Sequence, residues 1–287
     1  MSVYVTGDKH GNVDAIINAF HDNHLNIFKD KLIILGDVGL NYYGNNTDKK
    51  KKQRICDEMI EIYCVRGNHE MRPEDVLSMQ RFWDEELHNY TYVEPDYPFI
   101  NYLIDGEDYH FEGFHCLVIG GAYSVDKYYR LQRAQNEGVY AGWFENEQLT
   151  KEEMDAIYWK VRDRRFDFIF THTCPYFYQP TDLFLPQVDQ SMVDNTMEKF
   201  LDTILMNTYG RRWLFGHYHK DRIIAPDVEM LYNQVIKLRD INEYWYTFHR
   251  IKNKTQKPVN FSELPSRPLV DFSPIFPFWD EYICFDK

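Results

Sequence analysis

The chain has 287 residues, 44% of them hydrophobic and 27% charged, so it can bury a sizeable core as one domain or as one domain with an appendage. Its formal net charge of −13 argues against a protein that wraps long nucleic acid or lies on an anionic membrane. No apolar stretch is long enough to span a bilayer, and the chain begins with a predicted strand rather than a signal peptide, so we expect a cytoplasmic protein.

The first part of the chain predicts three short apolar strands with helical spacing between them. The strands cover residues 2–6, 31–35 and 62–65, and the helices cover residues 13–24 and 49–63. Such a β-α-β order is typical of a mainly parallel α/β sheet, whose strands are buried on both faces. Open sheets of this kind bind ligands at the carboxyl ends of their strands.

Polar residues follow each of these three strands directly. Side chains two residues apart at a strand end project to the same side, so an aspartate and a histidine in D-x-H spacing can reach one metal ion. The strand ends carry Asp8 and His10, then Asp37 after Gly36, then Asn68, His69 and Glu70 after Gly67.

The middle of the chain is less regular. Residues 73–87 predict a helix, and residues 99–104 and 109–111 predict the two strands of a β-hairpin around an Asp-Gly turn. A further buried strand is expected at 114–119, and residues 122–143, rich in Tyr, Arg and Gly, predict a long surface excursion.

Strands and helices alternate again after the excursion. Helices are predicted over 150–164 and 193–207, strands over 166–170 and 212–215, and a β-rich stretch over 222–235. Both strands are followed by imidazoles: His172 after the first, and His217 and His219 after the second.

Apart from Glu70, the five strand ends together hold two carboxylates, one amide and several imidazoles, a donor set that suits Mn, Fe or Zn. Two divalent ions held by only two carboxylates leave a net positive charge, which favours a substrate that carries phosphate. A lone histidine on a buried strand is more often a core residue. Five strand-end signals in order are not explained that way, and they predict a two-metal site.

The motifs D-x-H, G-D, G-N-H-[DE], a lone His and G-H-x-H, found over residues 3–235, resemble those of calcineurin-type metallophosphoesterases. The resemblance implies a four-layer α/β/β/α sandwich with two divalent or mixed-valence metal ions on the loops at the carboxyl ends of the strands. It also implies a role for each site residue. One ion would be held by Asp8, His10 and His219, the other by Asn68, His172 and His217, with Asp37 as the bridge and His69 beside them as donor of a hydrogen bond or proton.

The G-N-H-E motif at residues 67–70 resembles that of the protein Ser/Thr phosphatase branch. The G-D motif at residues 36–37 is followed by a sequence that departs from the pattern of that branch. That branch continues as G-D-x-V-D-R-G, with an arginine that grips phosphate, whereas residues 38–42 here are Val-Gly-Leu-Asn-Tyr. Arg72 and Arg130 are the candidate replacements, because arginine binds phosphate in a bidentate manner; each could equally be a surface or structural arginine. The basic run 49–52 is either a solvated helix face or a charge that steers the substrate.

The function expected from these residues is hydrolysis of a phosphomonoester (a small molecule, a nucleotide or a phosphoprotein) by metal-activated hydroxide, with Asp37 and His69 as catalytic residues. The alternatives are a phosphodiesterase, nuclease or nucleotide pyrophosphatase, and, in another class, a scaffold without catalysis that binds through its surface. Every expected ligand type is present, which favours the enzyme. The partner is then a phosphate-containing substrate, and neither a membrane nor a long nucleic acid.

The composition changes near residue 238. Residues 239–287 are rich in aromatic residues and proline, a density of proline that excludes long helices and central strands. We therefore expect a catalytic domain over residues 1–238 and a C-terminal extension that packs on it or joins a subunit contact. The five cysteines are scattered, without C-x-x-C spacing, and indicate free thiols in a reducing compartment.

Overall fold

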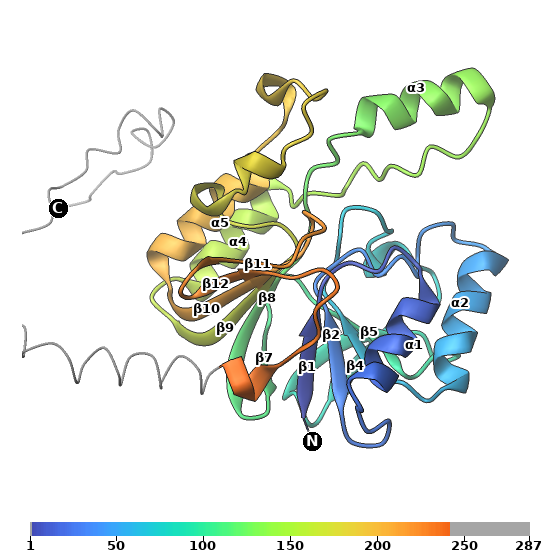
Figure 1. Ribbon diagram of the computed structural model, residues 1–287, viewed down its shortest axis with the longest axis vertical. Coiled ribbons are helices and arrows are strands. Elements are labelled where there is room, and N and C mark those ends of the chain that lie inside the picture. Colours follow the sequence, from blue (N-terminus) through green and yellow to red (C-terminus); the bar gives the residue numbers. More distant parts are fainter. Residues whose placement is uncertain (1, 242–287) are drawn as a thin grey trace, which may run out of the picture. The chain divides into compact units, whose positions relative to one another are not determined.

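The structure is a computed structural model, and it describes residues 2–241 (Figure 1). The C-terminal extension expected over 239–287 lies almost entirely outside these residues. Two β-sheets pack face to face, and helices cover their outer faces, so the predicted four-layer α/β/β/α architecture is confirmed.

The first sheet has seven strands, of which the four central ones run parallel. Their order across the sheet is β13 (Ile236–Lys237), β1 (Val3–Thr6), β2 (Lys31–Ile34), β3 (Ile62–Cys64), β6 (Ile100–Leu103), β5 (Asn89–Val93) and β4 (Gln80–Asp84).

The second sheet has six strands, with a parallel centre and one antiparallel strand at each edge. Their order is β11 (Arg222–Ala225), β12 (Val228–Met230), β10 (Tyr209–Phe215), β9 (Arg165–Thr171), β8 (Phe114–Ile119) and β7 (Asp108–Phe111).

The α-helices follow the strands in the alternating pattern that the sequence predicts. They are α1 (Val13–Asp22), α2 (Asn46–Asp57), α3 (Lys127–Glu137), α4 (Lys151–Val161) and α5 (Thr196–Asn207), with short 3₁₀ helices at Pro73–Asp75, Tyr176–Tyr178, Thr181–Leu183 and Gln190–Met192. None of the helices within residues 2–241 has the length and apolar character that a bilayer span requires.

Side chains that point alternately to the two faces of each sheet produce three hydrophobic layers. On β2, Ile33 points into the cluster between the two sheets, whereas Leu32 and Ile34 join the cluster under α1 and α2. On β10, Leu214 faces the other sheet and Trp213 packs under α4 and α5. Burial on both faces explains why these strands are continuous apolar runs in the sequence.

The helix predicted over 73–87 is wrong. Only Pro73–Asp75 is helical, and Gln80–Asp84 forms strand β4, which pairs with β5 as a hairpin. Trp83 and Tyr90 lie opposite each other with ring centroids 5.1 Å apart, and the Arg81 guanidinium lies 4.8 Å over the Tyr90 ring. Cross-strand contacts of this kind outweigh local helical preference.

The hairpin predicted from residues 99–104 and 109–111 is also wrong. Both strands exist, as β6 and β7, but they belong to different sheets: β6 pairs with β3 and β5, and β7 pairs with β8. The turn between them, with Gly106 at φ +75°, therefore carries the chain from one sheet to the other. In the predicted surface excursion, Lys127–Glu137 form α3, none of whose residues is buried.

Helix α2 is fixed to the sheet by a buried ion pair. The ammonium group of Lys52 contacts the carboxylate of Glu94, which also accepts a hydrogen bond from Ser78, and both charged residues are buried. Removing one partner leaves an uncompensated buried charge, whereas removing both does not.

We therefore expect Lys52→Met to lower the free energy of unfolding by about 3–5 kcal/mol, and the double variant Lys52→Met/Glu94→Leu to recover most of that loss. Urea unfolding of both proteins measures the difference, with the exposed Lys50→Met as the control. Equal destabilisation by the single and double variants would contradict a charge effect.

Candidate metal centre

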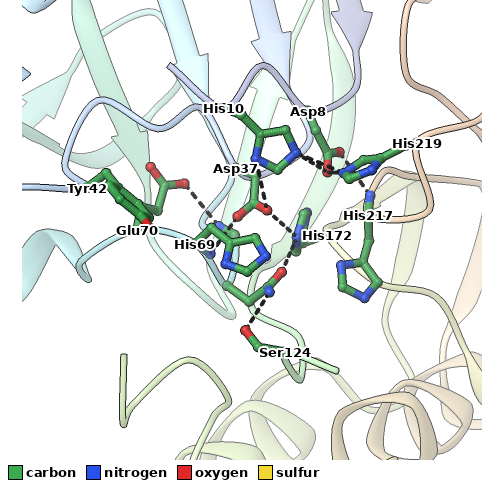
Figure 2. A network of polar contacts seen from close by, with 12 residues as sticks. Asp8, His10, Asp37, Tyr42, His69, Glu70, Ser124, His172, His217 and His219 are labelled. Atoms are coloured by element: carbon green, nitrogen blue, oxygen red, sulfur yellow. Dashed lines mark hydrogen bonds and ion pairs between the residues drawn. The ribbon is translucent and has the colours of Figure 1, made fainter. Parts of the chain in front are cut away.

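The predicted ligand residues come together where the carboxyl ends of both sheets meet. Figure 2 shows the side chains of Asp8, His10 and Asp37 from the first sheet facing His172, His217 and His219 from the second. The segments after β1, β2, β3, β9 and β10 carry them, as expected for parallel strands.

Unusual backbone conformations aim several of these side chains. His10, Asp37, His217 and His219 all have positive φ, between 47° and 68°, which non-glycine residues adopt at a cost. The motif glycines allow close approach to the carboxylates. A Cβ on Gly67 would lie 2.0 Å from Asp37 Oδ1, and one on Gly216 would lie 2.3 Å from Asp8 Oδ1.

Asp8 is anchored through one oxygen and offers the other to the site. Its Oδ1 accepts a hydrogen bond from the backbone N–H of His217 at 2.9 Å, and its buried Oδ2 has no hydrogen-bond partner. Oδ2 lies 3.3 Å from His219 Nε2 and 3.8 Å from His10 Nε2. Burial alone would raise the pKa of Asp8, but interaction with His172 and His219 outweighs it and keeps that pKa below its ordinary value.

Asp37 is held in the same way and lies between the two halves of the site. Its Oδ1 accepts the backbone N–H of His69 at 2.8 Å, and its buried Oδ2 has no hydrogen-bond partner. Oδ2 lies 3.7 Å from His10 Nδ1 on one side and 3.6 Å from His172 Nε2 on the other. It is therefore within reach of both sets of ligands.

The hydrogen bonds of His172 show which of its nitrogens is free. Nδ1 lies 2.8 Å from the carbonyl oxygen of Leu35, which can only accept, so Nδ1 carries the proton and Nε2 carries a lone pair. That lone pair lies 2.8 Å from Oδ1 of Asn68. Two acceptors thus face each other at hydrogen-bond distance, an arrangement that suits a shared cation.

The orientation of the Asn68 amide is set by two residues that sequence analysis missed. Asn68 Nδ2 donates to Ser124 Oγ at 2.8 Å, and Ser124 in turn donates to the buried carboxylate of Glu147, which also accepts the Ser124 N–H at 3.0 Å. The signal for Ser124 was its position five residues after the buried strand 114–119, at the same edge of the sheet. No local pattern marks Glu147.

The donor set fits metal ions. Nε2 of His10 and Nε2 of His219 lie 2.8 Å apart, a second close approach of two potential ligand atoms. The ligand atoms of Asp8, His10 and His219, and those of Asp8, Asp37 and His172, lie within 4.8 Å of one another in each group. Unpartnered carboxylate oxygens next to imidazole nitrogens are a combination that suits divalent cations.

A comparison with known proteins agrees with this geometry. The family model of calcineurin-like phosphoesterases matches residues 1–221. The chain belongs to the calcineurin-like phosphoesterase family. It is therefore a metal-dependent phosphoric ester hydrolase of a family that uses two metal ions, and the resemblance seen in the sequence is confirmed.

Other comparisons add less about this phosphoesterase. The solved structure of a phosphopantetheinyl hydrolase from Mycobacterium tuberculosis is 14% identical and aligns over 80% of this chain and 88% of that one, with a TM-score of 0.36. No curated protein matches the chain.

His69 lies beside the ligand residues of the phosphoesterase and faces a pocket. Its ring centroid is 6.0 Å from that of His10, and its buried Nδ1 has no hydrogen-bond partner. Burial and the nearby Arg130 guanidinium lower the pKa of His69 against the opposing charge of Asp37. Glu70, the next residue, accepts the backbone N–H of Gly67 at 3.1 Å, and burial raises its pKa to about 8.

The pocket has a volume of about 550 Å³, and the metal centre forms part of its lining. One side is lined by Tyr42, Tyr43, Lys51 and Arg130, and the other by apolar residues between Leu183 and Val193. Helix α3 and the segment between β9 and α5, which supply parts of these walls, project from the sandwich (Figure 1).

The two candidate phosphate-binding arginines lie in different places. Arg72 does not line the pocket; its guanidinium donates to the carbonyl oxygens of Asn146 and Gln148 and to the Glu153 carboxylate. Arg130 does line it, close enough to His69 to influence the pKa of that residue.

Glu198 is a buried acid at the pocket of the phosphoesterase. Its Oε1 accepts the Thr173 hydroxyl at 2.8 Å, its Oε2 has no hydrogen-bond partner, and burial raises its pKa from 4.5 to about 7. Below pH 4.5 the carboxyl is protonated in both the folded and the unfolded chain. As the pH rises toward 7 the unfolded chain loses the proton first, so ionisation favours unfolding and stability falls.

We expect Glu198→Gln to stabilise the metal-free protein at pH 8 by about 2–3 kcal/mol, with the gain vanishing near pH 4.5. Denaturant unfolding at both pH values measures it, with the exposed Glu145→Gln as the control. A stability difference between Glu198→Gln and the parent protein that does not change with pH would rule out ionisation of the buried carboxyl as its cause.

Proposed function

We propose that this phosphoesterase hydrolyses a phosphomonoester at a two-metal site, with catalysis assigned to residues 1–238. One ion would be held by Asp8, His10 and His219, and the other by Asn68, His172 and His217, with Asp37 placed to serve both. The observation that carries the proposal is the pair of close approaches between potential ligand atoms on either side of Asp37, His10 Nε2 with His219 Nε2 and the acceptor pair of Asn68 Oδ1 with His172 Nε2. Carboxylate, amide and imidazole ligands suit Mn, Fe or Zn.

Metal ions held by these residues would supply hydroxide near neutral pH and would neutralise charge on the phosphoryl oxygens. Proton donation and positioning are roles of residues of the chain itself. His69 faces the pocket beside Asp37, where its imidazole donates a hydrogen bond or a proton to the phosphoryl group or the leaving oxygen. The Asp37 carboxylate fixes the His69 backbone through its Oδ1 and so positions that donor.

The charge of the pocket favours a monoester over a diester. A phosphomonoester carries up to two negative charges and a diester one, and the pocket adds the ammonium group of Lys51 to the metal centre, whereas the Arg130 guanidinium is paired with Asp126. Of the two candidate arginines, Arg130 lines the pocket and Arg72 does not, so Arg130 remains our candidate for contact with phosphate. The free thiols of Cys56, Cys64, Cys116 and Cys174 fit a reducing compartment, and we place the reaction in the cytoplasm.

Hydrolysis of p-nitrophenyl phosphate and bis-p-nitrophenyl phosphate, measured with added Mn²⁺ and with EDTA, tests the reaction. We expect cleavage of the monoester that depends on Mn²⁺ and is abolished by EDTA, because bound metal ions would supply the hydroxide that attacks the phosphoryl group. Faster cleavage of the diester would identify a phosphodiesterase instead. Two bound metal ions with no cleavage of either ester would favour a scaffold without catalysis.

Two substitutions separate metal binding from proton donation. Asp37→Ala should lose bound metal and activity together, because both ligand groups flank this carboxylate. His69→Ala should keep its metal content and lose turnover by a factor of about 10²–10⁴. Metal analysis and kinetics on both proteins decide the assignment, and equal metal loss in the two would make His69 a ligand or a structural residue.

Ser124→Ala should weaken metal binding about tenfold or more, because the Asn68 amide loses the partner that turns its oxygen toward His172. Titration of the metal-free protein with Mn²⁺ measures this without any reliance on turnover. Ser191→Ala, an exposed serine on the pocket segment, is the control. Unchanged affinity in Ser124→Ala would mean that the amide keeps its orientation without the serine.

A further inference from the structure

The basic run at residues 49–52 has three different environments in the structure. Lys49 and Lys50 are exposed on α2, and Lys52 is buried against Glu94. Lys51 is half-buried and lines the pocket that contains the metal centre. Only Lys51 of this run is therefore placed to contact a substrate.

Lys51 lies against the loops that carry two site residues. Its Nζ lies 3.4 Å from the carbonyl oxygen of Gly39, two residues after Asp37. A Cβ on Gly11, the residue after His10, would come within 2.1 Å of the same Nζ. The ammonium group is thus at the rim of the metal centre, on the side of the loops after β1 and β2.

The charge of Lys51 has no counter-charge in the described part of the chain. Its Nζ makes one hydrogen bond, to Gly39, and lies 5.6 Å over the ring of Tyr43, but no ion pair forms within residues 2–241. Arg130, the other cation of this wall, is paired with Asp126 at 2.6 Å. With metal ions bound at the adjacent site, this half-buried ammonium group would be repelled by them unless an anion lay between.

Two tyrosines connect the two cations along the wall. Tyr43 lies under Lys51, its ring centroid is 4.7 Å from that of Tyr42, and the Tyr42 hydroxyl accepts from Arg130 at 3.0 Å. In Figure 2, Tyr42 and His217 lie on opposite sides of Asp37. The wall therefore extends away from the metal centre, and a pocket of about 550 Å³ holds much more than one phosphoryl group.

We propose that Lys51 binds a second anionic group on the leaving part of the substrate. The inference rests on the proposed function and deepens it: the substrate is a phosphoester that carries a further phosphate or carboxylate. The ammonium group of Lys51 donates charge-assisted hydrogen bonds to that second anion, while the scissile group lies at the metal centre beside His69. The apolar side of the pocket, at Leu183 and Phe184, contacts the carbon part.

Binding of phosphonates that cannot be hydrolysed tests the second subsite independently of turnover. The probes are benzylphosphonate and its 3-carboxy and 4-carboxy derivatives, titrated calorimetrically into the full chain loaded with Mn²⁺. We expect at least one carboxylated probe to bind about tenfold more tightly than benzylphosphonate, since a hydrogen bond between charged groups is worth roughly that factor or more. High salt should reduce the preference.

Matched lysine variants assign the preference to one residue. Lys51→Met should abolish the tighter binding of the carboxylated probes, and Lys51→Arg should retain most of it because the charge remains. Lys50→Met, one residue away on the exposed face of α2, should behave like the parent protein.

Equal affinity for the three phosphonates, or a preference that survives in Lys51→Met, overturns the inference. Hydrolysis of phenyl phosphate, measured alongside, tests the proposed reaction separately. If phenyl phosphate is not cleaved but the preference depends on Lys51, the anion subsite stands and the phosphomonoesterase reaction fails. If phenyl phosphate is cleaved and the probes bind equally, the reaction stands and the subsite fails.

Discussion

The convergence of candidate ligand atoms from both sheets is the constraint on which the rest of this structure depends. Asn68 Oδ1 and His172 Nε2, both acceptors, lie 2.8 Å apart, and the Nε2 atoms of His10 and His219 also lie 2.8 Å apart. Packing elsewhere must hold these side chains so close together. The hydrophobic layers between the sheets and under the helices do this, because both sheets end at the same edge and rigidly carry the loops.

The side chains around the ligands serve mainly to fix which atom faces the cation. Backbone N–H groups of His217 and His69 occupy one oxygen of each aspartate and leave the other free. The Leu35 carbonyl fixes the tautomer of His172, and the pair formed by Ser124 and Glu147 fixes the Asn68 amide. Asp8, Asp37, Asn68 and His172 thus each direct one potential ligand atom into the site, because another atom of the side chain is held by a hydrogen bond.

The location of the site at the carboxyl ends of the strands could be predicted from the sequence, because local patterns encode it. An apolar run predicts each strand, and the polar residues that follow mark its carboxyl end. The contacts that orient the ligands could not be predicted, since Ser124 and Glu147 meet Asn68 only through the fold. The helix predicted over residues 80–84 was wrong because these residues form a strand through pairing with β5, which outweighs their local helical preference. The assignment of β6 and β7 failed for a related reason, as a turn sequence does not specify which sheet each arm joins.

The hydrogen bond between His172 and the Leu35 carbonyl has a mechanical consequence. His172 follows β9 of one sheet and Leu35 follows β2 of the other, so this contact crosses the interface of the sandwich at the metal centre. A cation held by candidate ligands from both sheets would add its binding free energy to the cohesion between the sheets. Metal binding would then also stabilise the association of the two halves of the sandwich.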